Sequence, residues 1–197
     1  AFERLAERPL YQRGFSAVEV RLAGIASKTG KRAAQFKQTL RKTLGDFAVI
    51  TEPDSIGQLL EMGVDAVCVA TPDDRHFDAA YAVLSAGKHL LVEKPSVLSL
   101  AQLDELQRLA QEKQVLAKVV YHKLLDPDHK KLRTLVADGL LRHVNNGYCS
   151  LLEPKSIALG QFGEWIGGRN PATYVAVHYI KLVDFTFGGR LRGVSAT

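Results

Sequence analysis

Two short polar motifs follow apolar segments of the chain and could carry chemistry. Thr-Pro-Asp at 71–73 comes directly after the apolar residues 67–70, and Glu-Lys-Pro at 93–95 follows residues 90–92. Neither apolar segment alternates with polar residues, so both are predicted to be strands covered on two faces, as in parallel α/β sheets. Ligands of such sheets bind at the carboxyl ends of the strands. The sequence therefore predicts one crevice that contains a carboxylate, an ammonium group and a turn.

Alternating strands and helices are expected to position these motifs. The predicted strands span 18–26, 47–50, 65–70, 89–92 and 115–121, and the predicted helices span 2–10, 30–44, 54–63, 75–86 and 100–113. Asp54 is expected to cap one helix, and Ser99 with Gln102 forms a capping box before another. Strands alternating with helices of this length are typical of βαβ units. The predicted fold class is therefore α/β, with a Rossmann-type parallel sheet.

The pattern changes after Tyr121, where a second domain of mixed α/β type is expected to begin. A helix is predicted at 130–137, a strand of a half-exposed sheet at 144–151, and a glycine-rich loop at 159–170. The chain is thus expected to hold two domains, at 1–121 and 122–197.

Composition indicates a soluble globular protein. The 197 residues are 46% hydrophobic, and no apolar run approaches the roughly 20 residues that span a bilayer. Cys68 lies in an apolar segment and Cys149 has no CxxC partner, so neither a metal site nor a disulfide is expected. A reducing, cytoplasmic location and no membrane partner follow from this interpretation.

Six basic residues gather between positions 28 and 42, although the net charge is only +5. They are Lys28, Lys31, Arg32, Lys37, Arg41 and Lys42. Nucleic acid is one class of partner for such a cluster. The segment also reads as a helix whose buried stripe is Ala33, Ala34, Phe36, Leu40 and Leu44, which favours a solvated basic face. A cofactor phosphate at the first turn is the third alternative, and no nucleic-acid partner is predicted.

A phosphate-binding P-loop is excluded by its spacing. Five residues separate Gly24 from Gly30, where the motif requires four, and Arg32 occupies the position of the Ser or Thr that would hold magnesium.

The stretch "ATPDDRHFDAAYAVLSAGKHLLVEKP" resembles the central signature of the Gfo/Idh/MocA family of nicotinamide-dependent oxidoreductases. Segments on both sides resemble the same family in the same order. The resemblance implies NADP or NAD as the cofactor and a sugar, inositol or polyol-like substrate. It further implies a partial dinucleotide-binding domain at 1–121, the start of an α+β substrate domain at 122–197, and a homo-oligomer formed through that second domain.

The resemblance also implies roles for residues in the two polar motifs. Lys94 would contact the nicotinamide ribose and the substrate hydroxyl and assist proton movement, and Glu93 would hold a ribose hydroxyl. The family pattern TP-x-x-x-H matches Thr71, Pro72 and His76, which implies cofactor contacts for all three.

His178 is the candidate acid/base, because hydride transfer from an alcohol needs a group that takes the hydroxyl proton. The resembled family places an aspartate four residues earlier, and this chain has Tyr174 there. Lys181 occupies another position that is often aspartate. Tyr174 can substitute as a hydrogen-bonding hydroxyl, so it is counted with Lys94 and His178 as catalytic.

Ser27 and Lys28 follow the second predicted strand, where an acidic residue ordinarily binds the adenosine ribose of NAD. A hydroxyl and an ammonium group would instead bind the 2′-phosphate of NADP, with Arg32 as a further cation near the helix start. The resemblance therefore implies a preference for NADP.

Two further expectations concern the sequence upstream of this chain and the alternative function. The chain contains no G-x-G-x-x-G turn, so it is expected to be a fragment whose natural sequence carries this loop upstream. Because the fold also hosts regulators, a non-catalytic dinucleotide sensor is the alternative function, and Tyr174 and Lys181 motivate it.

Overall fold

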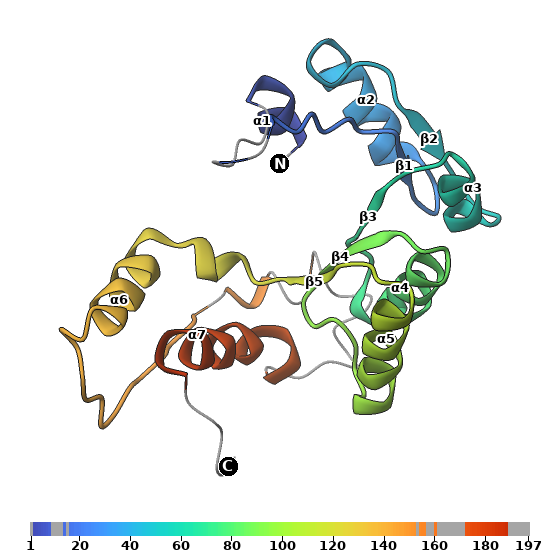
Figure 1. Cartoon of the computed structure of the whole chain (residues 1–197). Coiled ribbons are helices and arrows are strands. Elements are labelled where there is room, and N and C mark those ends of the chain that lie inside the picture. The colour runs from blue at the N-terminus through green and yellow to red at the C-terminus, as the bar shows by residue number, and fades with distance from the viewer. Residues whose placement is uncertain are drawn as a thin grey trace. The chain divides into compact units, whose positions relative to one another are not determined.

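The structure is a computed structural model that describes residues 2–8, 14, 16–152, 154–156, 160 and 172–188 (Figure 1). Its contacts divide the chain into two units. The first comprises Ala1–Val67, Tyr81–Leu90 and Leu109–Leu116, and the second comprises Cys68–Ala80, Leu91–Arg108 and Ala117–Thr197. These units are groups of residues in mutual contact and do not test the predicted domain boundary at 121/122, which stays a prediction.

A small parallel sheet organises the first unit. Strands β1 (Gly24–Ala26) and β2 (Ala48–Ile50) pair in parallel, with Ile25 opposite Val49. Helix α2 (Lys31–Leu44) connects the two strands, as a parallel pair requires. Helix α1 (Phe2–Glu7) packs on α2, and α3 (Ser55–Glu61) packs on β1 and β2. The first strand is shorter than the predicted span of 18–26.

The core of this unit forms where α2 meets the segments beside the sheet. Leu22, Leu44 and Phe47 are buried together, and Ile25, Leu40 and Val49 pack against them. Burial of a side chain of this size contributes about 1.5–3 kcal/mol before entropy costs. The predicted stripe of α2 is only partly correct, because Phe36 is 40% exposed although its ring centroid lies 6.4 Å from that of Phe47.

Local capping signals are confirmed. The Asp54 carboxylate accepts a hydrogen bond from the Gly57 amide at 3.1 Å and caps α3. The Ser99 hydroxyl accepts one from the Gln102 amide at 3.2 Å, at the start of α5 (Leu100–Glu112). Each cap satisfies an amide that has no partner inside its helix.

A second sheet has the order β3-β4-β5, formed by Ala66–Val69, His89–Glu93 and Ala117–Val120. Helix α4 (His76–Ser85) connects β3 to β4, and α5 connects β4 to β5. Most buried apolar side chains of this region come from α4 and the inner face of the strands, among them Val67, Val83, Leu84 and Val92. The predicted order of strands and helices is therefore confirmed.

The prediction that β3 and β4 are covered on both faces is wrong for this structure. Burial alternates along both strands, with Val67, Val69, Leu90 and Val92 on the covered side. Leu91 is 40% exposed on the other side. The continuous apolar run was expected to mean two covered faces, but the described residues cover only one.

The part of the chain after β5 is mostly helical. A 3₁₀ turn, η2 (His122–Leu125), leads to α6 (Pro127–Ala137), which Asp126 caps by accepting from two amides. A π-helix at Ala172–Ala176 continues into α7 (Val177–Phe187), which packs on α6.

A strand and a loop were also predicted between α6 and the π-helix. The predicted strand at 144–151 is wrong, because these residues form no regular element. The alternation there is weak, and no described neighbouring strand pairs with it. The predicted loop at 159–170 lies outside the described residues except at Gly160. No helix within the described ranges is long and apolar enough to cross a membrane.

Candidate functional site

His76 joins the turns that follow β3 and β4. Its Nδ1 lies 2.7 Å from the Pro95 carbonyl oxygen, and its Nε2 lies 2.8 Å from the Thr71 carbonyl oxygen. The side chain is only 1% exposed. Carbonyl oxygens only accept, so both contacts are hydrogen bonds at once when the imidazole carries two N–H groups. The two polar motifs predicted to share a crevice are thus tied to each other through one buried side chain.

The side chains of these turns differ in exposure. Thr71 and Pro72 are exposed, whereas Glu93 and Lys94 are half-buried. A Glu93 carboxylate oxygen accepts a hydrogen bond from the Lys94 amide at 3.2 Å, which closes the turn on itself. Unlike Thr71 and Pro72, His76 is buried, and both of its ring nitrogens contact carbonyl oxygens of the protein. Cofactor contacts of Thr71, Pro72, His76 and Glu93 stay predictions.

Lys94 and Tyr174 are in direct contact although 80 residues separate them. The Lys94 ammonium donates a hydrogen bond to the Tyr174 carbonyl oxygen at 2.7 Å. It also lies 4.6 Å from the centroid of the Tyr174 ring, within the range of a cation–π interaction. Two of the three predicted catalytic residues are therefore brought together, through the backbone and ring face of Tyr174.

The backbone at Tyr174 departs from the expected α-helix. Residues 172–176 form a π-helix, and α7 begins only at Val177. A π-helix closes its hydrogen bonds over five residues, so positions four apart no longer stand directly above one another. Tyr174 and His178 are four residues apart, but they do not share a face by α-helical spacing in this segment. Single π turns inside helices are frequent at functional sites.

His178 is buried among aromatic rings near the start of α7. Its side chain is 5% exposed. The ring of His122 meets it edge-on with centroids 4.5 Å apart, and the ring of Tyr121 does so at 6.3 Å. Among the described residues, nothing forms a hydrogen bond with His178 Nδ1. A buried polar atom without a partner is uncommon in proteins and marks a place where a ligand can bind.

The surroundings of His178 keep its imidazole neutral. Burial, the charge of Lys94 and the charges of His122 and Lys123 lower its pKa from 6.5 to about 4. Burial disfavours the charged ring, and nearby cations repel an added proton. At neutral pH the ring can therefore accept a proton, and Lys94, which contacts Tyr174, also acts on His178 through its charge.

The sequence predictions missed the residues that follow β5. Tyr121, His122 and Lys123 border His178, and none of them was singled out. The rule that ligands bind at the carboxyl ends of strands, applied to β5 as it was to β3 and β4, would have found them.

The turn after β1 contains the other predicted cofactor residues, in the first unit. Ser27 Oγ accepts a hydrogen bond from the Gly30 amide at 3.1 Å, while the Ser27 amide donates to the Ile50 carbonyl. Gly30 has φ 67°, and a Cβ there would lie 2.7 Å from Thr51 Cγ2, so glycine is required for this tight turn. The turn presents the exposed Lys28 to solvent directly before α2.

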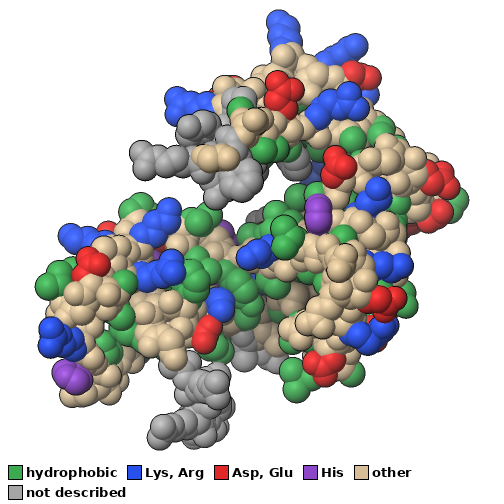
Figure 2. Space-filling view, viewed as in Figure 1, with side chains coloured by type: hydrophobic (Ala, Val, Ile, Leu, Met, Phe, Trp, Pro, Cys, Tyr) green, Lys and Arg blue, Asp and Glu red, His purple; other side chains and the backbone are tan. Residues whose placement is uncertain are grey.

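This turn suits an anionic group. The first turn of α2 contains no acidic residue, and both Lys31 and Arg32 are exposed there. The positive end of the helix dipole adds to their charge. Figure 2 shows basic side chains projecting over the part of the molecule that Figure 1 labels α2. The cations predicted to bind the 2′-phosphate of NADP are thus accessible, whereas Ser27 is half-buried.

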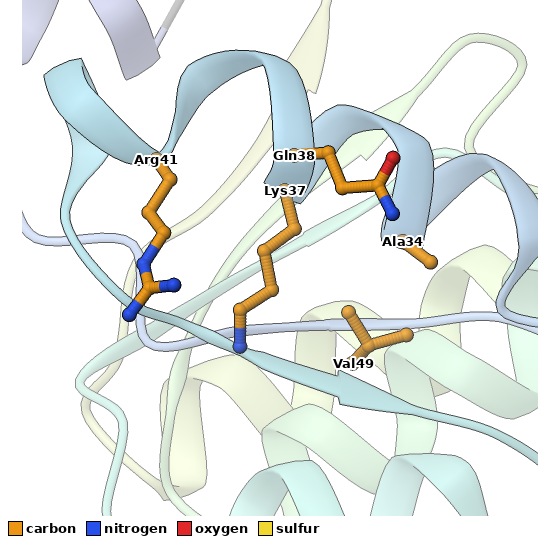
Figure 3. Close-up of a pocket in the computed structure, with 5 residues that line it drawn as sticks. All are labelled: Ala34, Lys37, Gln38, Arg41 and Val49. Carbon is orange, nitrogen blue, oxygen red and sulfur yellow. The ribbon is translucent and has the colours of Figure 1, made fainter.

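An open hollow lies farther along α2, away from this turn. It is lined by Ala34, Lys37, Gln38, Arg41 and Val49, as Figure 3 shows. Its two cations are engaged, because Lys37 and Arg41 approach an Asp46 carboxylate oxygen at 3.0 and 3.9 Å. None of the predicted site residues lines it. In the described part of the chain, no group of three or more His, Cys, Asp or Glu side chains could hold a metal ion.

Residues 4–121 match the profile of the Gfo/Idh/MocA oxidoreductases, described as an oxidoreductase family with an NAD-binding Rossmann fold. The match covers more than half of the chain. The chain belongs to this family. A nicotinamide dinucleotide is accordingly its cofactor class, and the basic turn after β1 suits the phosphate of such a group.

Individual relatives agree with this membership. The NADP-dependent scyllo-inositol 2-dehydrogenase IolW of Bacillus subtilis is 29% identical over 55% of this chain and 30% of its own length. The UDP-N-acetylglucosamine 3-dehydrogenase of Acidithiobacillus ferrooxidans is 30% identical over 69% of this chain and 40% of its own length. The chain therefore spans less than half the length of these curated relatives.

A solved structure shows the same fold. Apo scyllo-inositol dehydrogenase of Lactobacillus casei superposes with a TM-score of 0.68 at 19% identity, covering 95% of this chain and 51% of that protein. At this identity the likeness concerns the Rossmann-type fold alone.

Proposed function

We propose that the protein is an oxidoreductase that transfers a hydride between a nicotinamide cofactor and a hydroxyl-bearing carbon of an inositol, sugar or similar polyol. The observation that carries this proposal is the contact of Lys94, at the carboxyl end of β4, with Tyr174, together with the effect of the Lys94 charge on the buried His178. Family membership supports the reaction class, and the substrate names of the relatives support the substrate class.

In the oxidation direction, His178 takes the proton of the substrate hydroxyl. Its neutral ring and unpartnered Nδ1 suit this role. The carbon–oxygen bond becomes a carbonyl double bond as the C–H bond of the same carbon breaks. Its electron pair leaves with the hydrogen as a hydride. Bound NADP⁺ or NAD⁺ supplies the chemistry of accepting that hydride.

Lys94 orients the substrate oxygen and stabilises its developing negative charge. The Tyr174 carbonyl and ring hold the ammonium group in place, which limits the reorganisation needed during reaction. The half-buried Glu93 binds a ribose hydroxyl, and Thr71 and Pro72 shape the opposite wall of the crevice.

The cofactor is preferentially NADP. Ser27, Lys28 and Arg32 replace the acid that would accept hydrogen bonds from an unmodified ribose, and two of them are exposed cations. The Ser27 oxygen accepts from Gly30, and its own proton is directed to a phosphate oxygen. A carboxylate at this turn would repel the same phosphate.

A non-catalytic sensor is the second candidate, favoured by one observation. Lys181, at a position often occupied by aspartate, forms an ion pair with Asp184 at 2.8 Å. Among the residues that the structure describes, no carboxylate then bonds to His178 Nδ1 to orient the ring.

A turnover screen decides between the two. The protein is incubated with NADP⁺ and a panel of inositols, aldoses and sugar derivatives, and NADPH formation is followed by absorbance. Turnover of at least one polyol supports the enzyme. Tight NADPH binding without hydride transfer across the panel contradicts it and favours the sensor.

A further inference from the structure

His76 is a buried residue that joins the turns after two neighbouring strands. Strands β3 and β4 lie side by side in their sheet and end at Val69 and Glu93. Beyond these residues the ladder of the sheet no longer sets the distance between the two segments. The ring of His76 reaches both of them there, with Nδ1 2.7 Å from the Pro95 carbonyl oxygen and Nε2 2.8 Å from the Thr71 carbonyl oxygen. One side chain therefore sets how far apart the two turns lie.

An imidazole suits this place because its two nitrogens sit on opposite sides of one rigid ring. A carbonyl oxygen only accepts hydrogen bonds, so a ring with two N–H groups donates to both carbonyls. The His76 side chain is 1% exposed, so water can hardly replace either contact, and leaving either carbonyl unpaired is unfavourable. His76 is also the first residue of α4, on which Ala80, Val83 and Leu84 are fully buried. The ring therefore projects from a helix that the core already fixes.

Both carbonyls belong to turns that carry predicted site residues. Thr71 lies in the turn predicted to contact the cofactor, and Pro95 directly follows Lys94. The far end of the Lys94 side chain is held by the Tyr174 carbonyl, to which its ammonium donates at 2.7 Å. The contact of His76 with Pro95 fixes the backbone at the near end of the same residue. The place of the Lys94 ammonium therefore depends on a side chain that lies behind it.

We propose that His76 is a positioning residue, which sets the distance between the cofactor and the Lys94 ammonium. This inference goes beyond the proposed function and rests on it. The ring itself does not touch a ligand, because it is buried and both of its nitrogens face carbonyls of the protein. It acts through the backbone, by holding the turn of Thr71 and the turn of Lys94 at one separation. A displacement of about 1 Å at a catalytic group can lower the rate by about 10²-fold, so this separation matters for turnover.

Two substitutions separate the two contacts of His76. The carboxamide nitrogen of asparagine is bonded to Cγ, as Nδ1 of histidine is, whereas that of glutamine lies one bond farther out, as Nε2 does. Both nitrogens donate hydrogen bonds. His76→Asn therefore keeps a donor towards the Pro95 carbonyl and loses the donor towards Thr71. His76→Gln keeps the donor towards Thr71 and loses the donor towards Pro95.

Steady-state kinetics with NADP⁺ and a polyol found in the screen should give opposite results for the two variants. His76→Gln releases the turn of Lys94, so kcat should fall about tenfold or more while the KM for NADP⁺ changes about threefold or less. His76→Asn releases the turn of Thr71, so the KM for NADP⁺ should rise about tenfold while kcat changes about threefold or less. His143→Asn and His143→Gln make the same changes at an exposed histidine and should keep both constants.

A purely structural role of His76 would give a different pattern. It would reduce the amount of folded protein in both variants, without exchanging the effects on kcat and KM between them. Both variants are therefore measured in the presence of trimethylamine N-oxide, which favours the compact state, and circular dichroism checks that they are folded. The same pattern of kcat and KM in both variants, or a variant that stays unfolded under these conditions, overturns the inference in favour of a structural role.

A binding measurement distinguishes failure of this inference from failure of the proposed function. Fluorescence titration with NADPH needs no turnover. His76→Asn should weaken NADPH binding about tenfold and His76→Gln about threefold or less, because only the first releases the turn of Thr71. Equal affinities of the two variants overturn the inference. Absence of turnover in the wild-type protein, with the expected order of affinities, overturns only the proposed function.

Discussion

His178 is buried and lies near several cations, and both effects lower the pKa of its imidazole. Burial disfavours the charged ring, and Lys94, His122 and Lys123 repel it. A fixed aspartate would oppose both effects and hold the ring protonated over a wider pH range. The residue at that position, Tyr174, instead contacts Lys94 through its backbone carbonyl and its ring. The ammonium group that Tyr174 holds is one of the charges that keep His178 neutral.

Stability should depend on pH through His178. The pKa of the His178 imidazole is 6.5 in the unfolded chain and about 4 in the native chain. Between pH 6.5 and pH 4 the unfolded state therefore binds the proton more strongly than the native state does. The free energy of unfolding should fall as pH decreases from 6.5 to 4, by on the order of 3 kcal/mol. Urea unfolding at several pH values measures this fall. It should be smaller in His178→Asn and retained in His143→Asn, an exposed histidine outside the cluster. Equal falls in all three proteins would contradict the lowered pKa.

Catalysis should depend on Lys94 and His178 separately. Lys94→Ala and His178→Asn are each expected to lower kcat by roughly 10²–10⁴-fold, because one removes the cation at the reacting oxygen and the other removes the proton acceptor. Steady-state kinetics with NADP⁺ and a polyol found in the screen give the values. Lys118→Ala, an exposed lysine on β5, should retain wild-type kcat. Retained turnover in His178→Asn would assign proton transfer to another group.

Turns at the carboxyl ends of strands carry the residues predicted to contact the cofactor. In the first unit, Gly30 permits a tight turn after β1. In the second, His76 fastens the turn after β3 to the turn after β4 through its two ring nitrogens. Each turn is therefore held by contacts within its own unit.

Cofactor preference should follow the charge of the turn after β1. Lys28→Asp is expected to reduce the ratio of NADPH to NADH affinity by about tenfold or more, because a carboxylate repels the 2′-phosphate and accepts from a ribose. Fluorescence titration with both cofactors measures the ratio. Lys42→Asp makes the same charge change at the exposed far end of α2 and should leave the ratio unchanged. Equal ratios in the two variants would place the phosphate elsewhere.

Stability should depend strongly on His76. His76→Gln replaces two ring nitrogens, one near each carbonyl of Thr71 and Pro95, with a single carboxamide nitrogen, and an acceptor that loses its partner costs about 1–3 kcal/mol. Urea unfolding should show a loss within that range or somewhat above it. His143→Gln, at an exposed position, should change stability little. A variant as stable as the wild type would mean that the His76 contacts are replaced at no cost.

At the scale of the whole molecule, the predictable features were those encoded locally. The alternation of strands and helices and the caps at Asp54 and Ser99 follow from neighbouring residues, and the structure confirms them. Coverage of β3 and β4, and pairing of 144–151, depend on distant segments, and both predictions were wrong. The contact of His122 with His178 is likewise tertiary, since no spacing in the sequence relates β5 to α7.

The uncovered face of β3 and β4 can be tested through Cys68, which is exposed on it. Folded Cys149→Ser protein should react with a thiol reagent at Cys68, and faster as pH rises, because the thiolate is the reactive form; partial burial of the thiol raises its pKa, so the increase should extend to higher pH than for a free thiol. Absorbance of the released chromophore gives the rate. Reaction only after addition of denaturant would show that this face is covered, as the continuous apolar sequence of β3 suggests.

The π-helix before α7 has a consequence for how this chain tolerates insertions and deletions. A π turn amounts to an α-helix with one residue added, and each residue of an α-helix rotates the chain by about 100°. Deleting one residue within 172–176 would let the segment relax to α-helix and would swing the Tyr174 carbonyl away from the Lys94 ammonium. Helices usually absorb substitutions more readily than changes of length. In this one, deleting a residue other than Tyr174 would remove the carbonyl that holds the Lys94 ammonium while every side chain named in the site remained present.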